Sequence, residues 1–212
     1  MLHVSIEGEW SALDFSEYFA AIDKTYGVIA LIEVERRSAR EMERFYRDAI
    51  EFSPKEFRYA RRFMLLRGPN ALGYPGFGGG TLLDVSAYKD PAALLDDDEK
   101  LKVRRCTYAS PGATDFTGMG QALGHVKDIL LKCIEVCTGR RERNLKNDIL
   151  EQQRDAEVLK NVKERLAILK GLGYSDMQCR QVLAEVSPAV AKLEALASRG
   201  LVVGASVEGS DG

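Results

Sequence analysis

The chain has 212 residues, of which 45% are apolar and 29% are charged, and both fractions are ordinary for a globular protein that buries a core. Its 30 basic and 32 acidic residues give a net charge of −2, so no overall charge excess draws it to nucleic acid or to an anionic membrane. The longest apolar run, residues 27–32, is far shorter than the roughly 20 residues that a membrane-spanning helix needs. The first residues lack the layout of a signal peptide, so we expect a cytoplasmic protein.

The four cysteines and two histidines do not form a pattern of metal ligands. Cys133 and Cys137 are four residues apart on an apolar helix face, which is typical of buried, reduced thiols. His125 precedes Asp128 by three residues, but no nucleophile stands near the pair. We therefore predict a surface or boundary histidine, no catalytic residues, no metal and no cofactor.

The N-terminal residues predict a strand, a helix and a second strand. Apolar and polar residues alternate over residues 2–8, which indicates a half-buried strand. An amphipathic helix is expected over residues 10–26, capped by Ser11 with Asp14 and ended by the glycine that follows. The continuous apolar run that comes next predicts a buried strand over residues 28–35, so the three elements would form a β-α-β unit.

A helix predicted over residues 36–52 begins the densest basic stretch of the chain, in which aromatic residues alternate with arginines. Arginines on phosphates and aromatic rings on bases would make this stretch a nucleic-acid surface. Neighbouring acidic residues cancel most of the charge, so a solvated helix face is favoured and nucleic-acid binding is an alternative. The arginines of this alternative are Arg36, Arg37, Arg40, Arg58, Arg61 and Arg62.

Two glycine-rich segments raise the alternative of an enzyme that binds a nucleotide or another small ligand. Residues 68–80 form a predicted loop that leads into a strand-like run and supplies no lysine, so it lacks the features of a P-loop. Three later glycines have the outline of a dinucleotide fingerprint, but the strand before them ends about ten residues too early. The segments of this alternative are the loops at 73–80 and 110–120, and its glycines are Gly118 and Gly120 in the second loop and Gly124 after it.

The strand predicted over residues 101–108 alternates apolar and polar residues, and we expect the N-terminal sheet and helices to pack on it. A helix over residues 117–138 follows, and then a long polar helix over residues 140–170 with an apolar seam at alternating spacings of four and three. Such a polar helix projects readily from a compact domain, so we predict that the seam joins copies of the chain in a homo-oligomer. The seam consists of Leu145, Ile149, Ala156, Leu159, Val162, Leu166 and Leu169.

Two short helices are predicted near the C-terminus, and together they would form a helical hairpin. Ser175 and Gln178 have the spacing of a capping box at the start of the first helix. Ser187 and Pro188 would begin the second helix, and Gly200 would end it.

These elements predict an α+β fold in which residues 1–138 form a small sheet covered by helices. Residues 139–200 would form a helical module, and residues 201–212 a flexible tail. No set of residues identifies a reaction. The favoured hypothesis is a cytoplasmic, homo-oligomeric scaffold or regulatory protein that acts by binding a protein partner.

Overall fold

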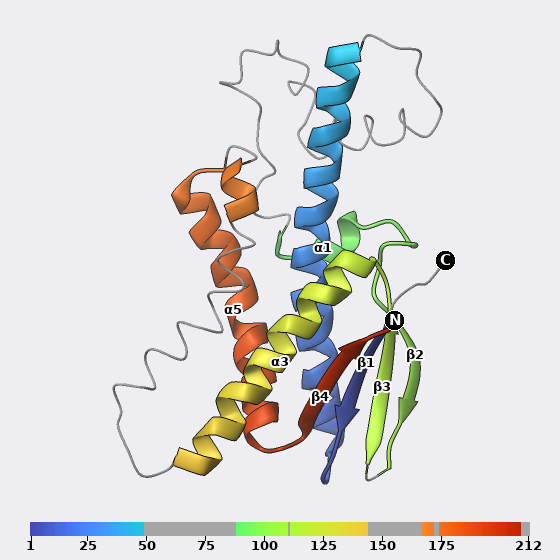
Figure 1. Cartoon of the computed structure of the whole chain (residues 1–212), viewed down its shortest axis with the longest axis vertical. Helices are drawn as coiled ribbons and strands as arrows, with labels where there is room; N and C mark the ends of the chain where they lie inside the picture. Colours follow the sequence, from blue (N-terminus) through green and yellow to red (C-terminus); the bar gives the residue numbers. More distant parts are fainter. Residues whose placement is uncertain (49–87, 110, 144–166, 172–173, 209–212) are drawn as a thin grey trace.

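The structure is a computed structural model that describes residues 1–48, 88–109, 111–143, 167–171 and 174–208. The described residues form a four-stranded antiparallel sheet of β1 (Leu2–Ile6), β2 (Lys102–Thr107), β3 (Gly112–Thr117) and β4 (Val202–Val207). The long helices of the described ranges are α1 (Ala12–Asp48), α3 (Gly120–Arg143) and α5 (Asp176–Ser198), and the short helix η3 (Pro91–Leu94) packs beside α1 (Figure 1). The predicted α+β fold class is confirmed.

The strand order is β2-β3-β1-β4, and every neighbouring pair is antiparallel. It follows that β1 and β2 run parallel with β3 between them, and that β3 and β4 run parallel with β1 between them. The connection from β1 to β2 contains α1, and the connection from β3 to β4 contains α3 and α5. Two interleaved β-α-β crossovers of this kind make up the split β-α-β arrangement.

The strand predicted over residues 28–35 is wrong, because α1 continues through that run. The helix begins as predicted: the Asp14 carboxylate accepts the Ser11 N–H at 2.9 Å, and the Ser11 hydroxyl accepts the Asp14 N–H at 3.1 Å. All of residues 28–35 are buried, so this part of the helix has no polar stripe and its sequence resembles that of a buried strand. Gly27 does not end the helix. A Cβ there would lie 2.7 Å from Cγ of Pro91, so the glycine lets η3 approach α1 closely.

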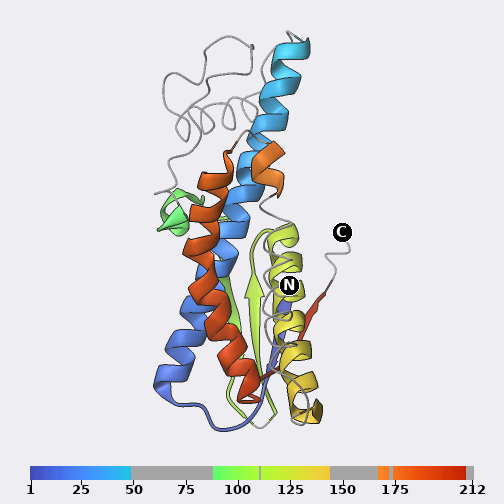
Figure 2. The ribbon, with the colours of Figure 1, turned by 90° about the vertical axis from the view of Figure 1, so that its left-hand side faces the viewer.

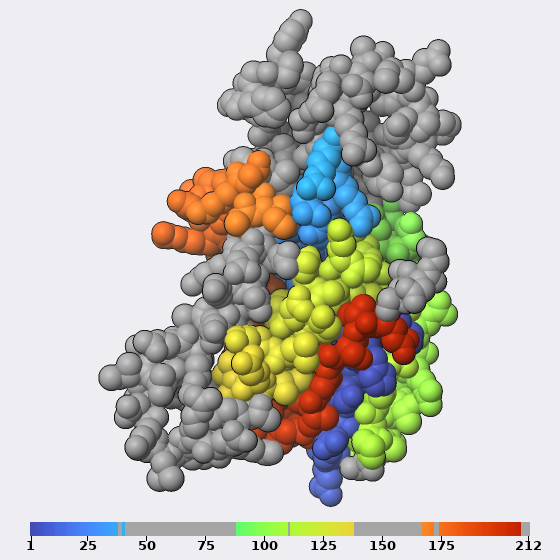
Figure 3. Space-filling view, in the orientation of Figure 1, coloured from blue at the N-terminus to red at the C-terminus, as the bar shows by residue number. Residues whose placement is uncertain are grey.

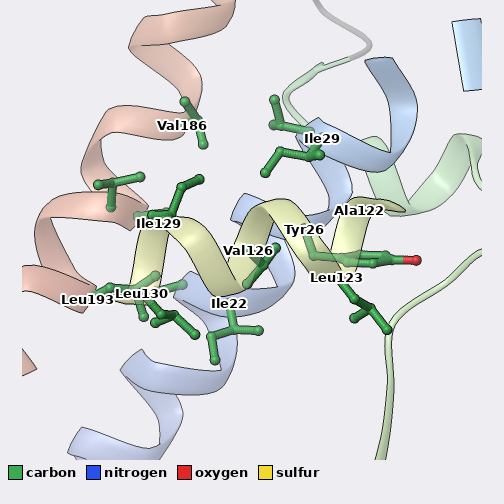
Figure 4. Packing of buried hydrophobic residues seen from close by; sticks show 14 of the residues in the cluster. Ile22, Tyr26, Ile29, Ala122, Leu123, Val126, Ile129, Leu130, Val186 and Leu193 are labelled. Carbon is green, nitrogen blue, oxygen red and sulfur yellow. The ribbon is translucent and has the colours of Figure 1, made fainter. Parts of the chain in front are cut away.

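The helices α1, α3 and α5 pack against one another, and α1 and α5 lie side by side along the long axis of the molecule (Figure 2). Figure 4 shows the apolar side chains that fill the space between the three helices. This core is continuous across the predicted division at residues 138 and 139, which falls within α3. The labelled side chains are Ile22, Tyr26 and Ile29 from α1, Ala122, Leu123, Val126, Ile129 and Leu130 from α3, and Val186 and Leu193 from α5.

The segment that follows residue 175 is one helix and not the predicted hairpin. The capping box of Ser175 and Gln178 is present, which confirms the predicted start. Pro188 lies inside α5 on its exposed side, where the interruption of main-chain hydrogen bonding faces solvent. The buried stripe continues on both sides of the proline, and its members include Val182, Val186, Ala189, Val190 and Leu193.

The predicted flexible tail is wrong for residues 202–207, which form β4 along the free side of β1. Leu2 lies opposite Val207 and Val4 opposite Ala205, and the Glu208 N–H donates to the Met1 carbonyl at 2.9 Å. Main-chain pairing of this kind does not depend on large side chains, so a run of small residues can form a strand.

Candidate interaction surface

Among the described strands, β2 lies at the edge of the sheet, and its residues on the helix side are exposed. Val103 lies opposite Phe116, and Cys106 lies opposite Thr114. Both partners in β3 are fully buried beneath the helices, whereas Val103 is 52% exposed and Cys106 is also exposed. The helix layer therefore ends before β2, which lies at the edge of the sheet away from α3 and α5 (Figure 1). The strand predicted at this position is confirmed, but it is not the centre of the sheet.

Aromatic side chains of α1 stand beside this uncovered strip. The ring of Phe15 lies 5.5 Å from that of Tyr108, edge to face, and the ring of Phe19 lies 6.1 Å from that of Phe116. Tyr108 directly follows β2 and is 58% exposed, while its hydroxyl accepts the Trp10 N–H at 3.2 Å. We call the resulting apolar strip the β2 ledge; it consists of Phe15, Phe19, Val103, Cys106 and Tyr108.

The β2 ledge is bordered by positive charge. Lys102, Arg104 and Arg105 are exposed, and β2 contains no acidic residue. The register with β3 shifts between Val103 and Arg105, so Arg104 is the extra residue of a bulge. In the space-filling view, β2 and β3 lie at the right-hand margin of the molecule, beyond α3 (Figure 3).

The opposite face of the sheet is polar. Arg105, Asp115, His3 and Ser206 lie in register across the four strands. His3 Nδ1 is 2.6 Å from Asp115 Oδ1, and the imidazole is partly exposed. The neighbouring row contains Thr107, Ala113, Ser5 and Gly204. Neither row offers an aromatic ring on which a nucleic-acid base could stack.

A buried carboxylate joins α1 to two other parts of the chain. Glu35 is fully buried and accepts hydrogen bonds from the hydroxyl of Tyr174 at 2.7 Å and from that of Tyr88 at 3.1 Å. Burial raises the pKa of both tyrosines, and the nearby charge of Glu35 raises them further. Both hydroxyls therefore remain protonated donors, and the cluster stabilises the packing of α1 against the segments before η3 and α5.

A second buried carboxylate, Glu33, lies beside Arg36 and His125, two residues that the sequence analysis considered as functional candidates. Its Oε2 lies 2.9 Å from Nη2 of Arg36, and its Oε1 lies 3.8 Å from Nε2 of His125. Arg36 is thus engaged in a partly buried ion pair, and the carboxylate beside His125 is Glu33. Arg37 and Arg40 are exposed on α1, whereas Arg58, Arg61 and Arg62 lie outside the described residues.

A side chain of α1 packs against the glycine segment that was predicted as a ligand loop before α3. A Cβ on Gly118 would lie 2.8 Å from Cζ of Tyr26, whose hydroxyl accepts the Met119 N–H at 2.7 Å and donates to the Glu99 carbonyl. Burial raises the pKa of Tyr26 to about 12. Tyr26 therefore packs directly against Gly118, the first glycine of the motif. Gly120 begins α3 and Gly124 lies within it, residues 112–117 form β3, and the loop at 73–80 lies outside the described residues.

The predicted oligomerisation seam lies almost wholly outside the described residues. Leu169 is the exception, and it is fully buried within its own chain, so its side chain is not available to a second copy. Cys133 and Cys137 are buried free thiols, as predicted. Over the described ranges, no three potential ligands come together as a metal site, and none of the helices is long and apolar enough to cross a membrane. The seam residues outside the description are Leu145, Ile149, Ala156, Leu159, Val162 and Leu166.

Sequence reasoning missed the β2 ledge, although one signal for it is present. Arg104 and Arg105 are consecutive charged residues within a strand, and charged side chains are typical of the edge of a sheet, so the pair argues against a central strand. The contribution of Phe15 and Phe19 from a distant helix has no local signal. No family model, no curated protein and no solved structure matches this chain, so the surface has to be interpreted from its own geometry and charge.

Proposed function

We propose that the protein acts by binding other polypeptides, as a scaffold or regulatory protein, and that the β2 ledge is its binding surface. The observation that carries this proposal is the exposure of Val103 and Tyr108, at 52% and 58%, beside the main-chain edge of β2 that none of the described strands pairs with. Exposed apolar side chains next to an unpaired strand edge are the two features that a polypeptide partner can cover together.

Covering the exposed side chains of the β2 ledge would contribute a modest free energy of binding. Complete burial of a large apolar side chain contributes roughly 1.5–3 kcal/mol, so covering the exposed half of Val103 or Tyr108 would contribute about 1 kcal/mol each. Main-chain hydrogen bonds along β2 would add to this contribution. A surface of this size suits a regulated or transient complex better than an obligate one.

Site-specific photocrosslinking in cells that produce the protein tests this proposal. A photoreactive amino acid at Val103 should yield a discrete crosslink to a second polypeptide. The matched control is Val203, which is 37% exposed on the other edge strand, β4, and should yield little product. Equal labelling from the two positions, or none from Val103, would contradict the proposal.

We further propose that the protein is a cytoplasmic homo-oligomer. The apolar seam at residues 145–169 supports self-association, although Leu169 does not contribute to it, and the free thiols suit a reducing compartment. Native mass spectrometry should show an oligomer that dissociates when Leu159→Glu and Leu166→Glu are combined. An unchanged mass would remove the role of the seam without affecting the proposal for the β2 ledge.

A further inference from the structure

We infer that the β2 ledge binds an extended segment of another protein in which apolar and acidic residues alternate, and that this segment joins the sheet as a fifth strand beside β2. The inference rests on the proposed function, because it names the kind of partner that the ledge would bind. Three features of β2 support it: its free edge, the two different faces that it presents, and its charge.

The free edge favours a strand over a helix. In an antiparallel ladder, alternate residues of an edge strand direct their N–H and C=O groups away from the neighbouring strand. Among the described strands, β2 pairs with β3 alone, so these groups face outward along its other side, before and after the bulge at Arg104. An added strand would satisfy them at a spacing of about 4.8 Å, whereas a helix satisfies its own main-chain groups and would leave those of β2 unpaired.

The two faces of β2 determine the pattern of the partner. On the helix side, Val103 and Cys106 are exposed and would be covered by apolar side chains of the added strand. On the other side, Lys102 lies opposite Thr117 and Arg105 opposite Asp115, so both basic residues project from the polar face. Because side chains of a strand alternate between faces, apolar residues on the first side imply acidic residues on the second.

Two other occupants of the β2 edge are a second copy of β2 and the acidic run of this chain, and neither fits. A second copy of β2 would bring Lys102, Arg104 and Arg105 close to the same three residues, and like charges facing each other destabilise strand pairing. The acidic run of this chain, residues 96–99, is held in a turn in which the Glu99 N–H donates to the Asp96 carbonyl at 2.9 Å. The charge of β2 therefore favours an acidic segment of another protein as the occupant.

Fluorescence anisotropy with the full-length protein tests the charge and the pattern. The probe is a labelled synthetic peptide of about eight residues in which valine and glutamate alternate, and the comparison peptide has lysine in place of glutamate. We expect the glutamate peptide to bind at least about tenfold more tightly, with an affinity that falls as salt rises. Combining Lys102→Glu, Arg104→Glu and Arg105→Glu should reverse this preference. No binding of either peptide, or equal binding of both, would overturn the inference.

Two further comparisons test the ledge and the strand pairing. Val103→Ser, which removes apolar surface without adding charge, should weaken binding of the glutamate peptide about tenfold, while the matched change Val203→Ser on β4 should leave it unchanged. N-methylation of the peptide on the edge that would face β2 should abolish binding, because it removes the main-chain donors. Undiminished binding of the methylated peptide would overturn strand addition. If Val103 crosslinks to a polypeptide but neither peptide binds, the proposed function stands and the acidic strand is rejected.

Discussion

Replacing glycine by alanine at two helix positions should change stability in opposite directions. Gly27 lies inside α1 and Gly124 inside α3, and in a helix interior alanine is favoured over glycine by about 0.8–1 kcal/mol. At Gly124 no atom of the described residues lies within 4 Å of the added Cβ. Gly124→Ala should therefore raise the free energy of unfolding by about 1 kcal/mol.

At Gly27 the same substitution meets η3. The added Cβ would lie 2.7 Å from Cγ and 3.3 Å from Cβ of Pro91, whereas non-bonded carbon atoms prefer separations of about 3.5–4.0 Å. The proline ring cannot rotate away, so α1 and η3 must separate, and overpacking of this kind costs about 1–3 kcal/mol. After subtraction of the helix-propensity gain, Gly27→Ala should destabilise the protein by about 1 kcal/mol.

Chemical unfolding in urea measures both changes as shifts in the transition midpoint at constant slope. The two variants should differ by about 2 kcal/mol, although the substitution is identical. In a Pro91→Ala background, which removes the Cγ atom, most of the penalty at Gly27 should disappear. If Gly27→Ala stabilises the protein as much as Gly124→Ala does, the close approach of η3 to α1 is refuted.

Three other predictions concern side chains whose surroundings the structure defines. Tyr174→Phe removes a hydrogen bond to the buried Glu35 carboxylate and should lower the free energy of unfolding by about 1.5–3 kcal/mol, and a loss under about 0.5 kcal/mol would show that the bond is absent. Cys106 should react rapidly with a thiol reagent in the native protein, whereas the buried thiols should react only after unfolding; burial raises the pKa of Cys133 in particular. The Arg199 guanidinium and Ser11 hold the pKa of Asp14 below its ordinary value of 3.8, so this carboxylate stabilises the fold above that pH and ceases to do so as the pH falls further. Arg199→Ala should weaken this acid dependence of the urea midpoint, and an unchanged pH profile would count against the ion pair.

The parts of the fold that could be predicted from the sequence are those decided by neighbouring residues. The capping pairs Ser11–Asp14 and Ser175–Gln178 were predicted correctly, because each depends on two residues three positions apart. The run at residues 28–35 was assigned wrongly, because a helix buried on all sides has no polar stripe to reveal its period. Pro188 was taken as a helix start because proline is common in the first turn of a helix, although the packing of the buried stripe keeps α5 continuous through it.

The candidate surface was not predictable because contacts between distant residues create it. Phe15 and Tyr108 are 93 positions apart in the sequence, a pairing that no periodicity indicates. His3 and Asp115 are likewise brought together only by the register of β1 with β3. What the sequence could offer was the pair Arg104–Arg105, whose charges on consecutive strand positions indicate an edge.

The return of the chain as β4 explains why one edge of the sheet is exposed more than the other. With β4 beside it, β1 has a neighbour on each side, and the N-terminal strand becomes central. α3 packs over β4, so the helix layer is centred on β1 and β4, and β2 projects beyond it. On the helix side of the sheet, Val202 of β4 lies opposite Ile6 and is 1% exposed, whereas Val103 of β2 is 52% exposed, which follows from this asymmetry. An added strand at β2 would cover apolar side chains that the helices leave exposed, whereas one at β4 would extend the side of the sheet on which α3 already packs.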